Sequence, residues 1–140
     1  MNHKTFAVLA LVLFAIGATA GCSREPAQRG GAAQASGDLQ IDFRSNPDPP
    51  VTGANSFEVD VRGADGTPVT DATVTAEFYM AAMPEMKMPE MRNSTTLTHE
   101  GGGTYRGEGQ VMMAGPWDVT VAVTRGGETI GSRKMAVTAR

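Results

Sequence analysis

Residues 117–124, WDVTVAVT, decide the fold class because apolar and polar positions alternate along the whole segment. One side carries the large apolar side chains Trp117, Val119, Val121 and Val123. A period of two is typical of a β-strand with one buried face, whereas an amphipathic helix has a period near 3.6. The segment therefore predicts a strand whose odd-numbered side chains lie in a core.

Six other segments are also predicted to be strands, and the chain turns at glycine-rich sequences between several of them: 39–45 (LQIDFRS), 56–62 (SFEVDVR), 72–80 (ATVTAEFYM), 93–100 (NSTTLTHE), 104–111 (TYRGEGQV) and 128–139 (ETIGSRKMAVTA). In the last segment Ile130 and Met135 differ in parity, which predicts a bulge near Gly131. Seven short strands without a helical stretch favour an all-β fold, namely an immunoglobulin-like antiparallel β-sandwich. A small barrel is the alternative.

The N-terminus has the features of an export signal. Lys4 precedes an uncharged run, FAVLALVLFAIGATAG, that ends at Cys22. This order predicts a secretory signal over 1–21, with an uncleaved membrane anchor as the alternative. The sequence TAGC at 19–22 resembles the lipobox of bacterial lipoproteins, although Thr19 replaces the usual leucine, so we expect lipid on Cys22. The small polar residues 23–38 predict a flexible tether, and 39–140 a single domain.

Composition excludes several function classes. Cys22 is the only cysteine, so the domain has neither an internal disulfide nor a thiolate metal site. Without residues 1–21 the net charge falls from −3 to −4, which argues against nucleic-acid binding. His99 is the only histidine after the signal, and no base and nucleophile pair is evident. We therefore expect a protein that is not an enzyme.

Residues 80–91, MAAMPEMKMPEM, contain five methionines in twelve positions. Met80 continues the apolar parity of Phe78, so we expect it in the core. Pro84 and Pro89 bias the chain toward extended or polyproline conformations and remove backbone donors, which predicts a loop over 81–91. In such a loop the remaining four thioethers cannot all face the core, and some should reach the surface: Met83, Met86, Met88 and Met91.

Three interpretations of this loop remain open. Thioethers are soft, neutral ligands that favour Cu(I), or Ag(I), over harder cations. The loop would otherwise be a flexible hydrophobic lid over one end of the sandwich, or a surface that adapts to a protein partner. Weaker candidate ligands are Met80 and His99, the latter expected as a solvated surface residue. The MMAGPW sequence at 112–117 adds Met112, Met113 and Trp117, and Trp117 shares the parity of the core valines.

Two stretches resemble the YtkA-like domain and the related FixH-like proteins: GTPVTDATVTAEFYMAAMPEMKMPEM at 66–91 and GGGTYRGEGQVMMAGPWDVTVAVTRGGE at 101–128. The resemblance covers about 55–139. It implies a small envelope β-sandwich, often a lipoprotein, associated with heavy-metal efflux adaptors or copper-oxidase assembly.

The resemblance and the residues together lead to one expectation about function. We expect a lipid-anchored domain of the cell envelope that binds or passes Cu(I) or Ag(I), with a transporter, efflux adaptor or oxidase-assembly protein as partner. Ser23 favours the outer membrane if the cell is Gram-negative. The alternative is an interaction module of an envelope complex without a metal of its own.

Overall fold

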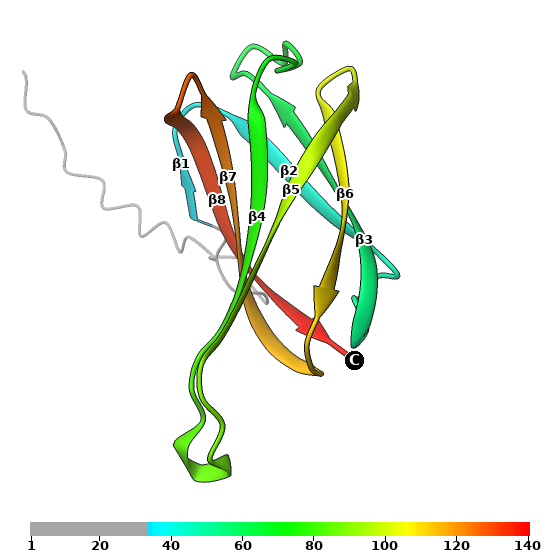
Figure 1. Ribbon diagram of the computed structural model, residues 1–140. Coiled ribbons are helices and arrows are strands. Elements are labelled where there is room, and N and C mark those ends of the chain that lie inside the picture. Colours follow the sequence, from blue (N-terminus) through cyan, green and yellow to red (C-terminus); the bar gives the residue numbers. More distant parts are fainter. Residues whose placement is uncertain (1–33) are drawn as a thin grey trace, which may run out of the picture.

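The computed structural model describes residues 34–140 (Figure 1). The predicted signal, Cys22 and residues 23–33 of the predicted tether lie outside this range. The elements in chain order are β1 (Gln34–Ser36), β2 (Gln40–Asn46), β3 (Gly53–Arg62), β4 (Thr73–Met80), the 3-10 helix η1 (Pro84–Met86), β5 (Met91–Gly101), β6 (Thr104–Val111), β7 (Gly115–Arg125) and β8 (Glu128–Ala139). All seven predicted strands are present. Within residues 34–140 no helix is long and apolar enough to cross a membrane.

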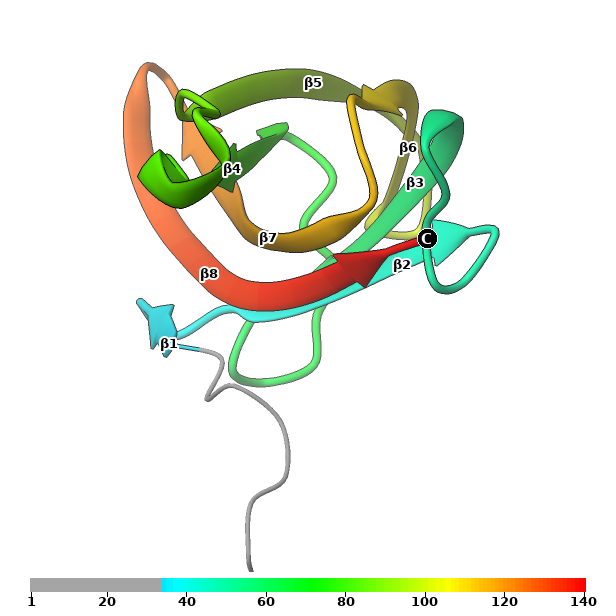
Figure 2. The same ribbon diagram turned by 90° about the horizontal axis from the view of Figure 1, so that it is seen from below.

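The strands form one antiparallel sheet in the order β1-β8-β7-β4-β5-β6-β3-β2, which curls back on itself (Figure 2). β5 makes the curl possible because it belongs to both layers. Its first part pairs with β4, from Met91 opposite Met80 to Leu97 opposite Val74, and its last part pairs with β6. The all-β sandwich is confirmed, and β5 closes one of its sides, which gives the fold part of the character of the barrel alternative.

The other side of the sheet is a seam between β2 and β8. Arg133 of β8 reaches across this seam with one guanidinium nitrogen. That nitrogen donates to the backbone oxygen of Ile41. It also donates to the carboxylate of Asp42, over a distance of 3.1 Å. A side chain thus makes the polar connection between the two strands that lie beside each other in Figure 2.

The core lies inside the curled sheet and is built by the alternating side chains. Trp117, Val119, Val121 and Val123 of β7 are all buried, as the opening segment predicted. Three phenylalanines pack around them from the other strands, with ring centroids 4.7 Å apart for Phe57 and Phe78 and 5.7 Å apart for Phe43 and Phe57. Each fully buried side chain of this size contributes about 1.5–3 kcal/mol of hydrophobic stabilisation.

The structure confirms the predicted bulge in β8. Val123 lies opposite Gly131 and Thr124 opposite Thr129, so Ile130 is the extra residue. Gly131 also allows the residue before β2 to approach, because a Cβ atom there would lie 2.8 Å from a methyl carbon of Leu39. The bulge therefore reverses which side chains of β8 face the core, and it does so beside Gly131, where Leu39 approaches the strand.

One strand was not predicted. Residues 34–36 belong to the segment expected to be tether, yet they pair with β8, from Gln34 opposite Lys134 to Ser36 opposite Ser132. The sequence QAS has no apolar alternation, so its strand conformation comes from the exposed edge of β8 and not from its own pattern.

Candidate functional site

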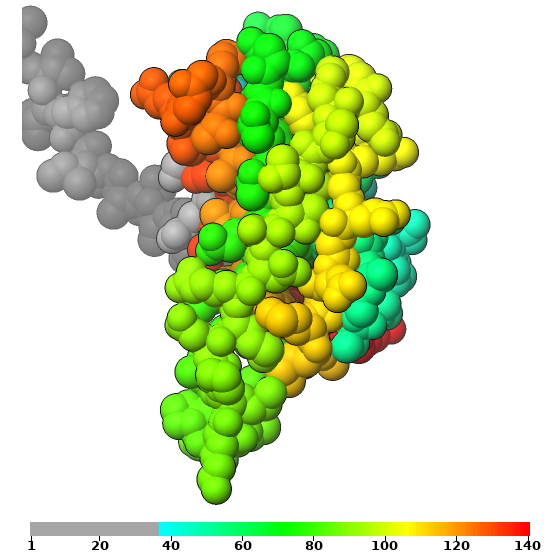
Figure 3. All heavy atoms as spheres, in the orientation of Figure 1, coloured from blue at the N-terminus to red at the C-terminus, as the bar shows by residue number. Residues whose placement is uncertain are grey.

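Residues 81–90, which connect β4 to β5 and which we name the Met arm, extend beyond the end of the sheet (Figures 1 and 3). The predicted loop is confirmed in this position. Seen from below, the arm stands to one side and leaves the end of the curled sheet uncovered (Figure 2). This position argues against a lid over the whole end of the sandwich, although Met83 packs against the core.

The arm is a short hairpin held by its own backbone. The amide of Met83 donates to the carbonyl oxygen of Met88 at 2.9 Å, and the amide of Met88 donates to that of Met83 at 3.1 Å. Between them η1 forms a single 3-10 turn, closed by a bond of 3.0 Å from the Met86 amide to the Met83 oxygen. Lys87 follows in the left-handed region with φ 55°.

This turn corrects the expectation of an extended or polyproline conformation at 84–87. Pro84 suits the first helical position, because its fixed φ fits a helical turn and its missing N–H is not needed there. Met86 and Met88 consequently do not lie along one face of an extended strand. The chain reverses direction between them, which places Met88 opposite Met83.

Four methionines form two cross-strand pairs. Met80 lies opposite Met91 where β4 and β5 leave the sheet, and Met83 lies opposite Met88 farther along the arm. Side chains of directly opposed residues point to the same face, with Cβ atoms about 4.5–5.5 Å apart. Because the thioether side chain has three rotatable bonds, each pair is able to bring two sulfurs onto one small ligand.

The five methionines differ in their exposure to solvent. Met80 is 2% exposed and belongs to the core, as predicted. Met83, Met88 and Met91 are half-buried, and two of them, Met83 and Met91, pack against the core. Met86 is 59% exposed. The prediction that some thioethers of this segment reach the surface is confirmed at Met86.

A shallow pocket of about 220 Å³ lies between the arm and β7. Met80 and Met83 line it together with Pro116 and Trp117. Gly115 provides the space beside it, since a Cβ atom at this position would lie 3.3 Å from the terminal methyl of Met80. Met80 and Met83 therefore line the same pocket as the first residues of β7.

Three more of the weaker candidate residues lie at the same end of the sheet. Met112, which is 47% exposed, and the half-buried Met113 precede β7. Trp117 is 2% exposed, and its indole N–H donates to the backbone oxygen of Met113 at 3.0 Å. The tryptophan is thus a core residue, as its parity predicted, and not an exposed aromatic face for a metal ion.

His99 lies far from these methionines. It is eight residues beyond Met91 on β5, which corresponds to about 26 Å of strand. Its side chain is exposed, and its ring centroid is 5.0 Å from that of Tyr105. The structure therefore does not bring His99 to the Met arm. Among residues 34–140 no group of three or more His, Cys, Asp or Glu side chains is placed to hold a metal ion.

A charged cluster at the root of the arm was not predicted. The guanidinium carbon of Arg92 lies 4.4 Å from the ring centroid of Tyr79. Arg92 also pairs with Glu77 at 3.3 Å and with Glu90 at 3.7 Å. Because Arg92 follows Met91 and Tyr79 precedes Met80, these contacts hold the two strand ends that carry the first methionine pair. Only the register of β4 against β5 reveals the cluster, and the sequence pattern alone does not supply it.

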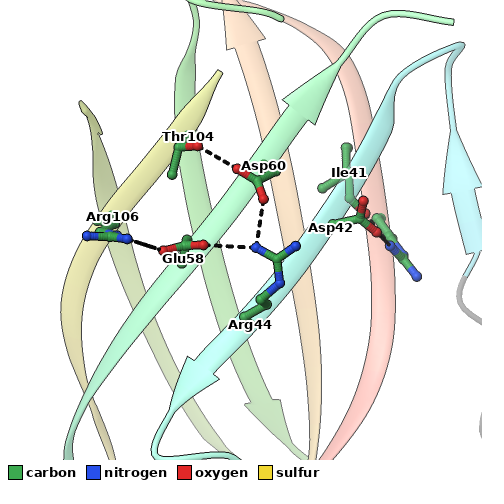
Figure 4. A network of polar contacts seen from close by, with 8 residues as sticks. Ile41, Asp42, Arg44, Glu58, Asp60, Thr104 and Arg106 are labelled. Atoms are coloured by element: carbon green, nitrogen blue, oxygen red, sulfur yellow. Dashed lines mark hydrogen bonds and ion pairs between the residues drawn. The ribbon is translucent and has the colours of Figure 1, made fainter. Parts of the chain in front are cut away.

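A second polar group lies on the outer face of β2, β3 and β6 (Figure 4). Glu58 accepts from Arg44 at 2.9 Å and from Arg106 at 2.7 Å, and Asp60 accepts from Arg44 at 2.7 Å and from Thr104 at 2.6 Å. The Thr104 hydroxyl, followed by the Arg44 guanidinium, holds the pKa of Asp60 below its ordinary value. The hollow of about 410 Å³ beside Glu58 is also lined by Arg44 and Arg106, and both guanidinium groups are already paired with carboxylates. We assign this network to strand pairing.

Comparison with known proteins gives a family assignment. No curated protein and no solved structure matches the chain significantly. The model of the YtkA-like family matches residues 33–122, which span β1 to most of β7 and include the whole Met arm. This range begins earlier and ends earlier than the resemblance noted in the sequence, but it contains the same Met-Pro segment. The match covers more than half of the chain, and the chain therefore belongs to the YtkA-like family.

Proposed function

We propose that this protein is a carrier of Cu(I), or of Ag(I), in the cell envelope, and that the Met arm is its binding site. The observation that carries the proposal is the pairing of Met83 with Met88 across a hairpin that lies outside the sheet. Core packing explains part of the surface of Met83 but does not explain Met86 and Met88, which are not packed against the core. Two opposed thioethers, with a third on the turn between them, are a suitable donor set for a soft monovalent ion.

The thioether chemistry also suits an oxidising compartment. A thioether has no proton to lose on binding a metal, and it does not form disulfides. Binding by Met83, Met86 and Met88, with Met91 adjacent, should therefore change little between about pH 5 and pH 7, since metal affinity depends on pH through ligand deprotonation. A histidine ligand would instead weaken near its reference pKa of about 6.5.

The envelope location rests on the N-terminal sequence. In this proposal the signal over 1–21 is removed, Cys22 carries lipid, and residues after it tether the domain to a membrane. The partners would be an envelope transporter, an efflux adaptor or an oxidase-assembly protein of the kind associated with YtkA-like and FixH-like domains. The protein would carry its cargo unchanged and would not be an enzyme.

Competition for Cu(I) tests the site. The full chain, purified in detergent under anaerobic reducing conditions, is titrated against a coloured Cu(I) chelator. The test variant carries isoleucine at 83, 86, 88 and 91, which keeps apolar bulk and removes sulfur. The control carries isoleucine at 112 and 135, two methionines outside the arm. We expect wild type and the control to withdraw copper from the chelator and the arm variant to leave it there.

If all three proteins leave copper with the chelator, the proposal fails. If the arm variant holds copper as tightly as wild type, the site lies elsewhere in the chain. Zn(II) in place of Cu(I) should not bind to any of the three proteins, because a neutral sulfur set discriminates by softness.

The lipid anchor needs a separate test. Cells expressing wild type or Cys22→Ser are labelled with a radioactive fatty acid, and the protein is immunoprecipitated. Label should appear in wild type alone. Equal label in both proteins would remove Cys22 as the modified residue, without bearing on copper binding.

The second candidate function is an interaction module without a metal. It is favoured by the shape of the arm, whose tip has a hollow of about 410 Å³ lined by Ala82, Met83, Pro84, Glu85 and Met86. A surface that contacts a protein through apolar bulk should tolerate the isoleucine substitutions, since hydrophobic exchanges of similar volume are well tolerated. Copper binding that is lost in the arm variant would therefore favour the carrier over this module.

A further inference from the structure

Met86 differs from the other methionines of the arm in its surroundings. Its side chain is 59% exposed, whereas Met83 and Met88 are half-buried and Met83 packs against the core. Met86 also has no methionine opposite it, because it lies in the 3-10 turn that connects the paired residues. The arm therefore combines one sheltered pair of thioethers with one thioether that solvent reaches.

The turn that carries the exposed thioether is nevertheless held in place by its backbone. The amide of Met86 donates to the Met83 oxygen at 3.0 Å, and the amide of Lys87 donates to the Pro84 oxygen at 3.0 Å. These bonds and the proline ring restrict the backbone of the turn. The backbone of Met86 accordingly stays within one turn of the sheltered pair, while its exposed side chain can turn between that pair and solvent. This combination is what a ligand needs if it is to reach a second molecule without leaving the site.

Resting on the proposed function, we infer that Met86 is the exchange ligand of the Met arm. Met83 and Met88 hold the ion and set its affinity. Met86 is the ligand that gives way when Cu(I) passes to a protein that presents its own methionine or cysteine sulfur. The projection of the arm beyond the sheet lets that protein approach the tip without contacting the strands (Figure 3).

The step is an exchange of ligands. One bond forms between copper and the incoming sulfur, and the bond from copper to the Met86 sulfur breaks. Copper stays Cu(I), so neither an oxidant nor a reductant is needed. An incoming methionine transfers no proton, whereas an incoming cysteine loses its thiol proton to solvent as it binds.

Transfer kinetics test the inference, with bicinchoninate as the acceptor. The full chain is loaded with one equivalent of Cu(I) in detergent, mixed with excess bicinchoninate, and followed by the absorbance of the copper complex. In wild type the transfer rate should rise in proportion to the bicinchoninate concentration, because the acceptor takes part in the exchange. Met86→Ile should raise this rate by at least about tenfold, because the acceptor no longer has to displace a sulfur, and should change the dissociation constant by less than about threefold, well below the usual cost of losing a holding group.

Met88→Ile is the matched variant. It should weaken affinity by at least about tenfold, since even the loss of an outer partner costs a metal site that much. An unchanged or lower transfer rate in Met86→Ile, or a wild-type rate independent of bicinchoninate, would overturn the inference. Failure of the proposed function shows earlier and separately, because wild type would then retain no copper at the loading step. Circular dichroism confirms that both variants keep their strands.

Discussion

The indole N–H of Trp117 donates to the backbone oxygen of Met113, 3.0 Å away, so the largest aromatic side chain of the core also fixes the connection that precedes its own strand. The same side chain lines the pocket against Met80 and Met83. The core and the base of the Met arm thus meet at one residue. A change at this residue should affect the stability of the sheet and the position of the β6–β7 connection together.

Trp117→Ala should lower the free energy of unfolding by about 3–5 kcal/mol, the range for removing a large buried aromatic side chain. Trp117→Phe keeps an aromatic ring but leaves the Met113 oxygen without its donor, and should cost less than the alanine variant. Urea unfolding followed by circular dichroism measures both, because the chain has no second tryptophan to report fluorescence. A loss below about 1 kcal/mol for the alanine variant would contradict the buried position of the ring.

Gly109→Ala tests the close approach of β6 to its neighbours. A Cβ atom there would lie 2.5 Å from the hydroxyl oxygen of Thr95 and 2.9 Å from a ring carbon of Phe57. Since Gly109 does not have a positive φ, the cost is steric, and we expect a destabilisation of about 1–3 kcal/mol. Gln110→Ala, at the exposed next position of the strand, is the control and should be nearly neutral. Equal stabilities of the two variants would show that the strands can separate at no cost.

The lowered pKa of Asp60 predicts how stability depends on pH. Its largest cause is the hydrogen bond from Thr104. A carboxyl whose folded pKa lies below its ordinary value of 3.8 stabilises the fold fully above that value, and this contribution is lost as the pH falls through the folded pKa. Thr104→Val raises the folded pKa toward 3.8, so acid unfolding should begin at a higher pH than in wild type.

Acid titration followed by circular dichroism measures this shift, with Thr138→Val on the exposed side of β8 as the control. The control should unfold at the wild-type pH. If Thr104→Val and Thr138→Val have the same acid midpoint, the hydroxyl of Thr104 does not govern the titration of Asp60.

Oxidation by dilute hydrogen peroxide should follow the exposure of the methionines. Met86 and Met112 are 59% and 47% exposed and should form sulfoxide first, whereas the core residue Met80 should react last. Peptide mass spectrometry at successive times gives the order. Early oxidation of Met80 would mean that the base of the arm opens far more than the structure indicates.

Much of the fold was predictable because its signal is local. The alternation in 117–124 and in the other apolar segments gives each strand and its buried face, and the change of parity between Ile130 and Met135 gives the bulge. β1 was missed because QAS has no pattern of its own and depends on the edge of β8. The closure of the sheet through β5 was also missed, since one strand that pairs with two layers needs no unusual sequence.

The candidate site was predictable in composition but not in arrangement. Proline and methionine content placed the loop and its exposed sulfur correctly. The sequence did not reveal which methionines face each other, because the register of a hairpin depends on its turn. Here that turn is a 3-10 helix followed by Lys87 in the left-handed region. The proline and methionine content of the segment does not predict this conformation. The distance of His99 from the arm followed only from its place on β5.

The register of the arm has a consequence for how its length can change. Three residues lead from Met80 to Met83 on one side of the arm, and three lead from Met88 to Met91 on the other. An insertion or deletion on one side alone would place a methionine opposite a residue without sulfur and turn later side chains to the other face. Matched insertions or deletions on both sides would keep the facing pairs. Diverged chains that conserve this thioether arrangement should therefore vary in length by equal steps on the two sides.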